Sequence, residues 1–172
     1  MLINVEDLYP RKILNFYFPL PLGNKINVIE DIKTIKDEFL LNIFTEIDVN
    51  YCLLSKEGLS IGYNSGVADD IRAFVLAQID DYITAGTPDI ETIAEVSDFK
   101  LAQVLADAYI RPILHRDGGD IEICSIDFGV MTLSFKGHCI GCPLAGNTLQ
   151  NVIKKKFLHF MPDLKDIKLK EE

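Results

Sequence analysis

Cysteine is scarce in this chain of 172 residues, and long apolar runs are missing from it. The four cysteines, Cys52, Cys124, Cys139 and Cys142, are too few and too scattered for a disulfide scaffold, so we expect reduced thiols. No stretch approaches the roughly 20 apolar residues of a membrane-spanning helix, and we expect no membrane partner. The first residues show neither a signal-peptide nor a transit-peptide pattern. The expected location is the bacterial cytoplasm, with the mitochondrial matrix as the alternative.

Positive charge is also in short supply. The chain carries 17 Lys and Arg against 26 Asp and Glu, a formal net charge of -9. The acidic excess lies before residue 101, since residues 101–172 hold nine basic and nine acidic side chains. Such a balance lacks the cationic surface that the phosphate backbone requires, so no nucleic-acid partner is expected. The apolar content of 48% predicts packed cores rather than disorder.

The first half of the chain predicts a sheet backed by helices. Its expected elements are a strand at 12–18, a helix from Thr34, strands at 49–55 and 59–65, and a helix at 68–84. Gly58 is expected in the turn between the paired strands. Gly86 is expected to end the second helix, and Thr87-Pro88 is typical of a new helix start.

The second half predicts helix, two strands, helix and strand. These elements are a helix from Ser97 that Pro112 kinks or ends, strands at 120–128 and 130–137, a helix from Pro143 and a strand at 165–170. The sequence between the first helix and the strands, Asp117-Gly118-Gly119-Asp120, is typical of a helix stop and turn. We therefore expect two small α/β domains, residues 1–88 and 89–172, each a short sheet packed against helices.

The pair Cys139 and Cys142 carries the strongest chemical signal. The motif Cys-Ile-Gly-Cys follows a predicted strand and places Cys142 at the start of a helix. Two sulfurs three residues apart converge on one point, and a helix N-terminus stabilises thiolates. The pair is half of a four-thiolate metal site. Cys52 and Cys124 lie in apolar strands and look like core residues, so the other two sulfurs are expected from a second copy of the chain.

Spacing alone leaves three functions open for this pair: an iron-sulfur cluster site, a zinc site and a redox dithiol. Zinc could recruit His138 as a third ligand, although no second ligand pair stands at a zinc-finger spacing. A dithiol of the thioredoxin type needs more chain than the 30 residues that follow Cys142.

The segment from IRPILHRDGGDIEI through LSFKGHCIGCPLAGNTLQNVI closely resembles the C-terminal domain of NifU-like, or Nfu-type, iron-sulfur cluster carriers. The shared features are an Arg-Pro pair followed by DGGDIE, the strand pair, a Gly two residues before the first Cys, CxxCP, and a Thr-Leu pair in the next helix. They cover residues 97–170. Residues 10–85 resemble, more loosely, the N-terminal domain of one branch of the same family.

The resemblance implies a role for the chain. Cys139 and Cys142 would be cluster ligands, and a 4Fe-4S cluster would be shared across a homodimer. The chain would receive its cluster from upstream cluster-assembly machinery and pass it to apo iron-sulfur client proteins. It would be a carrier or scaffold, not an enzyme, with no catalytic residues.

Overall fold

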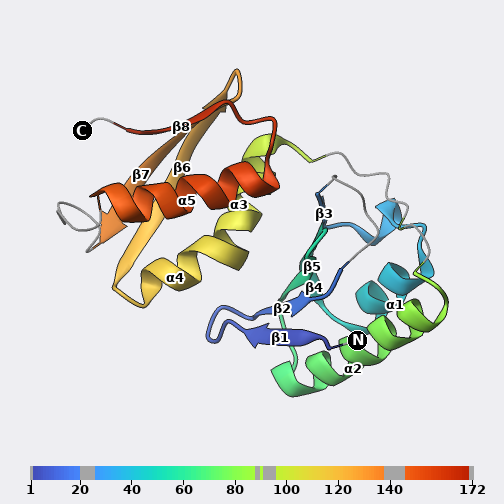
Figure 1. The fold of residues 1–172 in the computed structure, drawn as a ribbon. Coiled ribbons are helices and arrows are strands. Elements are labelled where there is room, and N and C mark those ends of the chain that lie inside the picture. The colour runs from blue at the N-terminus through green and yellow to red at the C-terminus, as the bar shows by residue number, and fades with distance from the viewer. Residues whose placement is uncertain (1, 20–25, 88–89, 91–95, 138–145, 171–172) are drawn as a thin grey trace. The chain divides into compact units, whose positions relative to one another are not determined.

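The computed structural model of the chain describes residues 2–19, 26–87, 90, 96–137 and 146–170. The chain divides into two compact units, Met1–Val96 and Ser97–Glu172, called here the N-terminal and C-terminal units. The predicted boundary at 88/89 lies outside the described residues. Each unit is a sheet packed with helices, so the predicted α/β class is confirmed (Figure 1).

The N-terminal unit is built on a five-stranded antiparallel sheet of order β1-β2-β5-β4-β3. Its strands are β1 (Asn4–Asp7), β2 (Ile13–Tyr17), β3 (Asn27–Ile29), β4 (Val49–Ser55) and β5 (Gly58–Tyr63). The predicted β4–β5 hairpin is confirmed, with Gly58 at a φ of 140° after the turn. The sequence did not predict β1 and β3, the two short strands at the edges of the sheet.

Two α-helices pack on one side of this sheet, α1 (Glu38–Glu46) and α2 (Ala68–Thr84) (Figure 1). The predicted helix start at Thr34 is wrong, because Thr34 ends a short 3₁₀ helix, η1 (Ile32–Thr34). The carboxylate of Asp37 caps α1 instead, accepting a hydrogen bond of 3.2 Å from the Leu40 N–H. The predicted stop of α2 is confirmed, since Gly86 has a φ of 92°.

One apolar cluster joins the sheet to both helices. Alternate residues of each strand point to the same face, and the helices turn one apolar stripe toward it. The fully buried members of the cluster, none more than 1% exposed, are Leu14, Phe16, Ile29, Leu40, Ile43, Cys52, Leu54, Leu59, Ile61, Val75 and Ile79. Burial of these side chains is the main stabilising contribution in this unit.

The C-terminal unit starts with three consecutive helical segments, α3 (Asp98–Leu105), the π-helical η2 (Ala106–Ile110) and α4 (Arg111–His115). The Ser97 hydroxyl caps α3, accepting a hydrogen bond of 3.3 Å from the Lys100 N–H. Pro112 was expected to kink or end the helix near Arg111. The helical run continues to His115: a π-helical segment ends at Ile110, and Pro112 lies in the first turn of α4, where a missing N–H costs little.

The rest of the unit is a three-stranded sheet with one more helix. The elements are β6 (Gly119–Asp127), β7 (Val130–Gly137), α5 (Gly146–Phe160) and β8 (Asp166–Leu169). The strand order is β6-β7-β8, with β6 and β7 antiparallel and β7 and β8 parallel. Helix α5 lies across the sheet, beside α3 and α4 (Figure 1). Among the described helices, none is long and apolar enough to cross a membrane.

Candidate functional site

The predicted ligands, Cys139 and Cys142, lie in residues 138–145, outside the described residues, as do His138 and Pro143. The structure describes the strand that leads into this segment and the helix that leads out of it. Strand β7 ends at Gly137, and α5 is described from Gly146. The described parts of the candidate site are therefore the end of β7, helix α5 and the residues that hold these two elements in place.

Gly137 ends β7 in a conformation that requires glycine. Its φ is 64°, in the left-handed region. A Cβ built on Gly137 would lie 2.5 Å from the carbonyl oxygen of Gly118, far inside van der Waals contact. Strands β6 and β7 pair Gly119 with Gly137 at this end of the sheet. The glycine two residues before Cys139 thus allows the backbone of β7 to approach the turn before β6.

That turn confirms the prediction for residues 117–120. The Asp117 N–H donates to the Leu114 carbonyl at 3.0 Å, and the Gly118 N–H donates to the His115 carbonyl at 3.2 Å. Gly118 has a φ of 72°, which ends the helix, and β6 starts at the next residue. Two of the sequence features that carry the family resemblance, the DGGD turn and the glycine before Cys139, therefore meet in space.

Arg111 fixes the turn to the helix before it. Its guanidinium donates to the Asp107 carboxylate at 2.6 Å, to the Asp120 carboxylate at 3.0 Å and to the Ile121 carbonyl at 3.1 Å. His115 Nε2 lies 3.3 Å from the same Asp120 oxygen. The Arg-Pro and DGGD features thus belong to one network, which sequence reasoning did not predict because it depends on how the helix and strand pack.

The Asp120 carboxylate is held in its charged form. Partial burial by itself would raise the pKa of Asp120, but the hydrogen bond from the Ile121 N–H and the charges of Arg111 and His115 outweigh that effect. Its pKa therefore lies below the ordinary value for aspartate. Arg111 and His115 thus connect α4 with the start of β6, and the Arg111–Asp107 pair adds a contact within the helical run.

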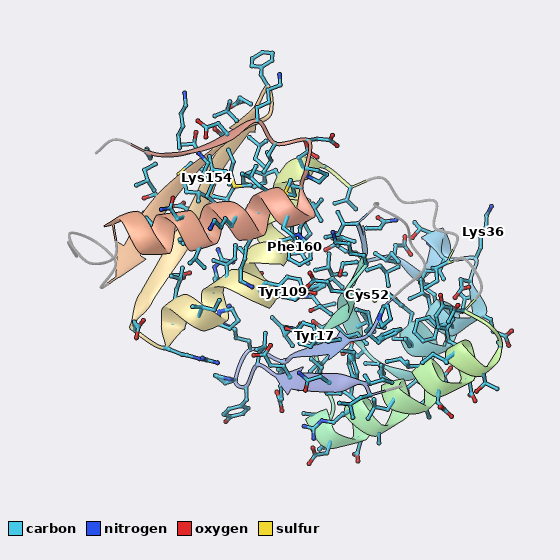
Figure 2. All side chains as sticks on the ribbon, in the orientation of Figure 1. Tyr17, Lys36, Cys52, Tyr109, Lys154 and Phe160 are labelled. Carbon is cyan, nitrogen blue, oxygen red and sulfur yellow. The ribbon has the colours of Figure 1, made fainter. Side chains whose placement is uncertain are left out.

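Helix α5 is anchored to the unit through its second half, residues 153–160. Ile153 and Phe157 are buried, and the Phe160 ring stacks on Tyr109 of η2 at a centroid distance of 4.9 Å (Figure 2). The Lys154 ammonium is paired with the Asp166 carboxylate of β8. Packing and charge thus fix the helix after residues 138–145, as the Gly118–Gly137 contact fixes the strand before them.

Comparison with known proteins agrees with this architecture. The pattern of the NifU-like domain family matches residues 103–168, which run from α3 to β8. Residues 103–168 of the C-terminal unit are thus similar to a NifU-like domain. The match spans the helix, the DGGD turn, both strands, the Cys139–Cys142 segment and α5, in the order that the sequence predicts.

Curated relatives carry related names. "NifU-like protein 4, mitochondrial" of Arabidopsis thaliana is 28% identical over 119 residues, covering 58% of this chain and 40% of its own length. The "NFU1 iron-sulfur cluster scaffold homolog, mitochondrial" of Drosophila willistoni is 29% identical over 107 residues, 56% of this chain and 37% of its own. The Homo sapiens protein of that name is 24% identical over 159 residues, 87% of this chain and 57% of its own. The chain thus spans about two fifths to three fifths of these relatives' length.

Cys52, outside the NifU-like domain, cannot serve as a ligand in the folded chain. It lies on β4, is fully buried in the core of the N-terminal unit (Figure 2), and was correctly predicted as a core residue. Burial raises the pKa of Cys52 to about 12. A thiol that stays protonated and enclosed is unable to supply the thiolate that a metal centre needs.

Cys124, inside the NifU-like domain, was expected in the core, and that expectation is wrong. The register of β6 shifts between Ile123 and Ser125, and Cys124 lies at this bulge with a half-buried side chain. The alternation that would have turned it inward is broken there, and Phe128, expected on the same face, is 96% exposed. Cys124 is four to five residues from the Gly119–Gly137 end of the strands, about 15 Å at 3.3 Å per residue.

The two described histidines of this region, His115 and His159, contact other side chains. His115 is engaged by Asp120, and the His159 ring meets Phe160 edge to face. In the part of the chain that the structure describes, no group of three or more His, Cys, Asp or Glu side chains could hold a metal ion. The sequence-predicted pair, Cys139 and Cys142, is the candidate that these observations leave.

Proposed function

We propose that this chain is an iron-sulfur cluster scaffold that binds a 4Fe-4S cluster through Cys139 and Cys142, shares it across a homodimer and transfers it to apo-proteins. The observation that carries the proposal is the match of residues 103–168 to the NifU-like domain, with the Cys-x-x-Cys pair between a fixed strand end and an anchored helix. The names of the relatives, iron-sulfur cluster scaffold homologues, support it.

The donor set supports sharing between two chains. A cluster of this kind takes four thiolates, and each chain offers two at this segment. Cys52 is enclosed in the other unit, and Cys124 stands about 15 Å along β6 from the Gly119–Gly137 end of the strands. The Cys139–Cys142 pair of a second copy supplies the missing two sulfurs most simply, because identical subunits form closed twofold pairs readily.

A shared site also suits a carrier. Its cluster is released when the subunits separate or when a client thiolate replaces a ligand. In this proposal the chain holds and hands over a preformed cluster and turns over no small substrate, so it is a carrier rather than an enzyme. The mitochondrial names of the relatives favour the mitochondrial matrix over the bacterial cytoplasm as the place of delivery.

Anaerobic reconstitution with iron and sulfide tests the proposal. We expect about four irons and four sulfides per dimer, and a shift from apo to dimer size on loading. Cys139→Ser and Cys142→Ser should each abolish loading without unfolding the chain, whereas the matched control Cys124→Ser should load normally. A monomer with one zinc and no sulfide would support the zinc alternative. Disulfide reductase activity lost in Cys139→Ser, with no cluster bound, would support the dithiol alternative.

A further inference from the structure

The helical run from Asp98 to His115 contains one turn that is wider than an α-turn. Within η2 the Arg111 N–H donates to the carbonyl of Ala106, five residues back, and not to a carbonyl four residues back. A π-turn of this kind adds one residue to the helix. Every residue after it is therefore displaced by one position, about 100° around the helix axis, from its place in a continuous α-helix.

The burial of side chains along the run shows the effect of that extra residue. Because three turns of an α-helix take about 11 residues, Ala102 and Ile113 would lie on the same side of a continuous helix. Ala102 is fully buried, but Ile113 is 38% exposed, and its neighbour Leu114 is only 2% exposed. The position in the core that a continuous helix would give to Ile113 is thus filled by Leu114.

The same displacement orients the two side chains that hold the turn before β6. Arg111 and His115 are four residues apart and so share one side of α4. Both reach the Asp120 carboxylate, at 3.0 Å from Arg111 Nε and 3.3 Å from His115 Nε2. In a continuous α-helix these two places would go to Ile110 and Leu114, whose side chains donate no hydrogen bonds.

We propose that this π-turn is a register switch, which passes between the described register and a minor one in which residues 98–115 form a continuous α-helix. Ile113 replaces Leu114 in the core of the minor register, an exchange of two apolar side chains of similar volume. Pro112 keeps that register minor, because in a continuous α-helix its ring meets the carbonyl of Ala108, four residues back. A minor state of this kind is populated at about 0.1–10%.

The switch controls how firmly the sheet end beside the candidate cluster site is held. In the described register Arg111 donates to Asp120, and two backbone hydrogen bonds of 3.0 and 3.2 Å join the turn to the end of α4. Both attachments are lost when α4 rotates. The same turn meets Gly137, two residues before Cys139. The inference rests on the proposed function, because it makes the minor register the state in which the chain releases its cluster more readily.

Relaxation-dispersion NMR on the full-length, ¹⁵N-labelled apo chain tests the switch without any cluster. We expect exchange on the microsecond-to-millisecond timescale at residues 106–118, with minor-state chemical shifts that move toward regular α-helical values. Pro112→Ala removes the ring that opposes the continuous helix and should raise the minor population at least about fivefold. A π-turn that only fixes the orientation of α4 predicts no exchange in the wild type or in this variant, and that result would overturn the proposal.

Residue 113 supplies the sharpest comparison. Ile113→Ser changes a side chain that is 38% exposed in the described register but enters the core in the minor one. It should lower the minor population at least about tenfold, and in Pro112→Ala/Ile113→Ser it should cancel the gain from the first substitution. Ile113→Leu keeps an apolar side chain of similar volume and should stay within about twofold of the wild type. Equal exchange in Ile113→Ser and Ile113→Leu would contradict a register shift.

The matched control is Phe99→Ser on α3. Phe99 is 37% exposed, close to the value for Ile113, but it precedes the π-turn and so keeps its place in both registers. Its substitution should leave the minor population within about twofold of the wild type. If Phe99→Ser and Ile113→Ser acted equally, general destabilisation of the helical run would explain the exchange, and the proposal would be overturned.

The rate at which an iron chelator removes the cluster from the reconstituted chain distinguishes the switch from the scaffold function. We expect Pro112→Ala to lose its cluster at least about threefold faster than the wild type, and Ile113→Ser at least about twofold more slowly. If the apo chain exchanges as expected but never loads a cluster, the switch stands and the scaffold function falls. If the chain loads normally but shows no exchange, or if all variants lose the cluster at one rate, the scaffold function stands and the inference falls.

Discussion

The N-terminal unit encloses its thiol, Cys52, beneath two helices, whereas the C-terminal unit leaves Cys124 half-exposed on a strand bulge. The two units also differ in net charge. Residues 1–96 carry seven basic and sixteen acidic side chains, and residues 97–172 carry ten of each. The N-terminal unit is thus acidic with a closed apolar core, and the C-terminal unit is neutral overall.

This contrast reveals where the C-terminal unit concentrates its specific contacts. Both units bury apolar side chains: one cluster joins the sheet to its helices in the N-terminal unit, and Leu105, Met131 and Phe157 are among the buried residues of the C-terminal unit. In the C-terminal unit a charged network around Arg111 and a glycine contact hold the sheet end that leads to residues 138–145. Substitutions at this sheet end should therefore act differently from substitutions at comparable positions of the N-terminal unit, and paired variants from the two units can test that contrast.

The largest effect is expected from Gly137→Ala. The left-handed backbone costs a residue with a Cβ about 1–2 kcal/mol, and the 2.5 Å approach to the Gly118 carbonyl adds a clash that only movement of β7 can relieve. We expect the free energy of unfolding to fall by about 3 kcal/mol, measured by urea denaturation, and cluster loading to fall with it.

Gly86→Ala is the matched control from the N-terminal unit. Gly86 also has a positive φ, 92°, but a Cβ there would meet no atom within 4 Å. The expected loss is about 1 kcal/mol, the cost of the backbone conformation alone. Equal losses in the two variants would show that the Gly118–Gly137 approach carries no energetic weight.

An intermediate effect is expected from Asp120→Asn, and it depends on pH. The folded-state pKa of Asp120 is depressed, so its contribution is present above the unfolded value of about 3.9 and is lost as pH falls through the folded value. At neutral pH the variant should lose about 1 kcal/mol, after allowance for screening at a side chain that is 41% exposed.

Urea denaturation between pH 7 and pH 2 measures this dependence. The gap between wild type and Asp120→Asn should narrow steadily below about pH 4, as the wild-type carboxylate becomes protonated. Asp69→Asn supplies a control for an exposed carboxylate of the N-terminal unit, with an expected change below about 0.5 kcal/mol. A gap that stays constant with pH would show that the charge of Asp120 is not what stabilises the turn.

The smallest effect is expected from Cys124→Ala. Because its side chain is half-exposed at a bulge, the loss in unfolding free energy should be below about 0.5 kcal/mol, and cluster loading should be unchanged. Cys52→Ala should cost about 1–2 kcal/mol, because it leaves a small cavity in a closed core. In the native chain a thiol reagent should modify Cys124 readily and Cys52 only on unfolding. Equal protection of the two thiols would contradict the contrast.

Much of the fold was predictable from the sequence where pattern and local chemistry agree. Helix α2 with its Gly86 stop, the β4–β5 hairpin, β6, β7 and the turn at 117–118 were predicted because periodicity and glycine positions are local signals. Strands β1 and β3 were missed, since short edge strands form only when a neighbour is already in place. The start of α1 was placed too early because Thr34 and Asp37 are both residues that favour a helix N-cap. In the structure the Asp37 carboxylate caps α1.

The candidate site also has features that the sequence predicts and features that it does not. The Cys139–Cys142 pair was predictable from spacing and resemblance, and its ligand role stays a prediction. The Arg111–Asp120 network was not predictable, since it joins residues that become neighbours only after the helix and β6 have packed. Cys124 was misplaced because alternation along a strand gives no warning of a bulge, which depends on the partner strand.

The parallel pairing of β7 and β8 has one further consequence. Two parallel strands need a crossover between them, and here α5 provides it, so β7, α5 and β8 form a βαβ unit. In such units ligands gather beyond the carboxyl ends of the strands, where connections can change without disturbing the sheet. Residues 138–145 occupy that place in the chain. A ligand held there could bind and be released while the hydrogen bonds of the sheet stay intact.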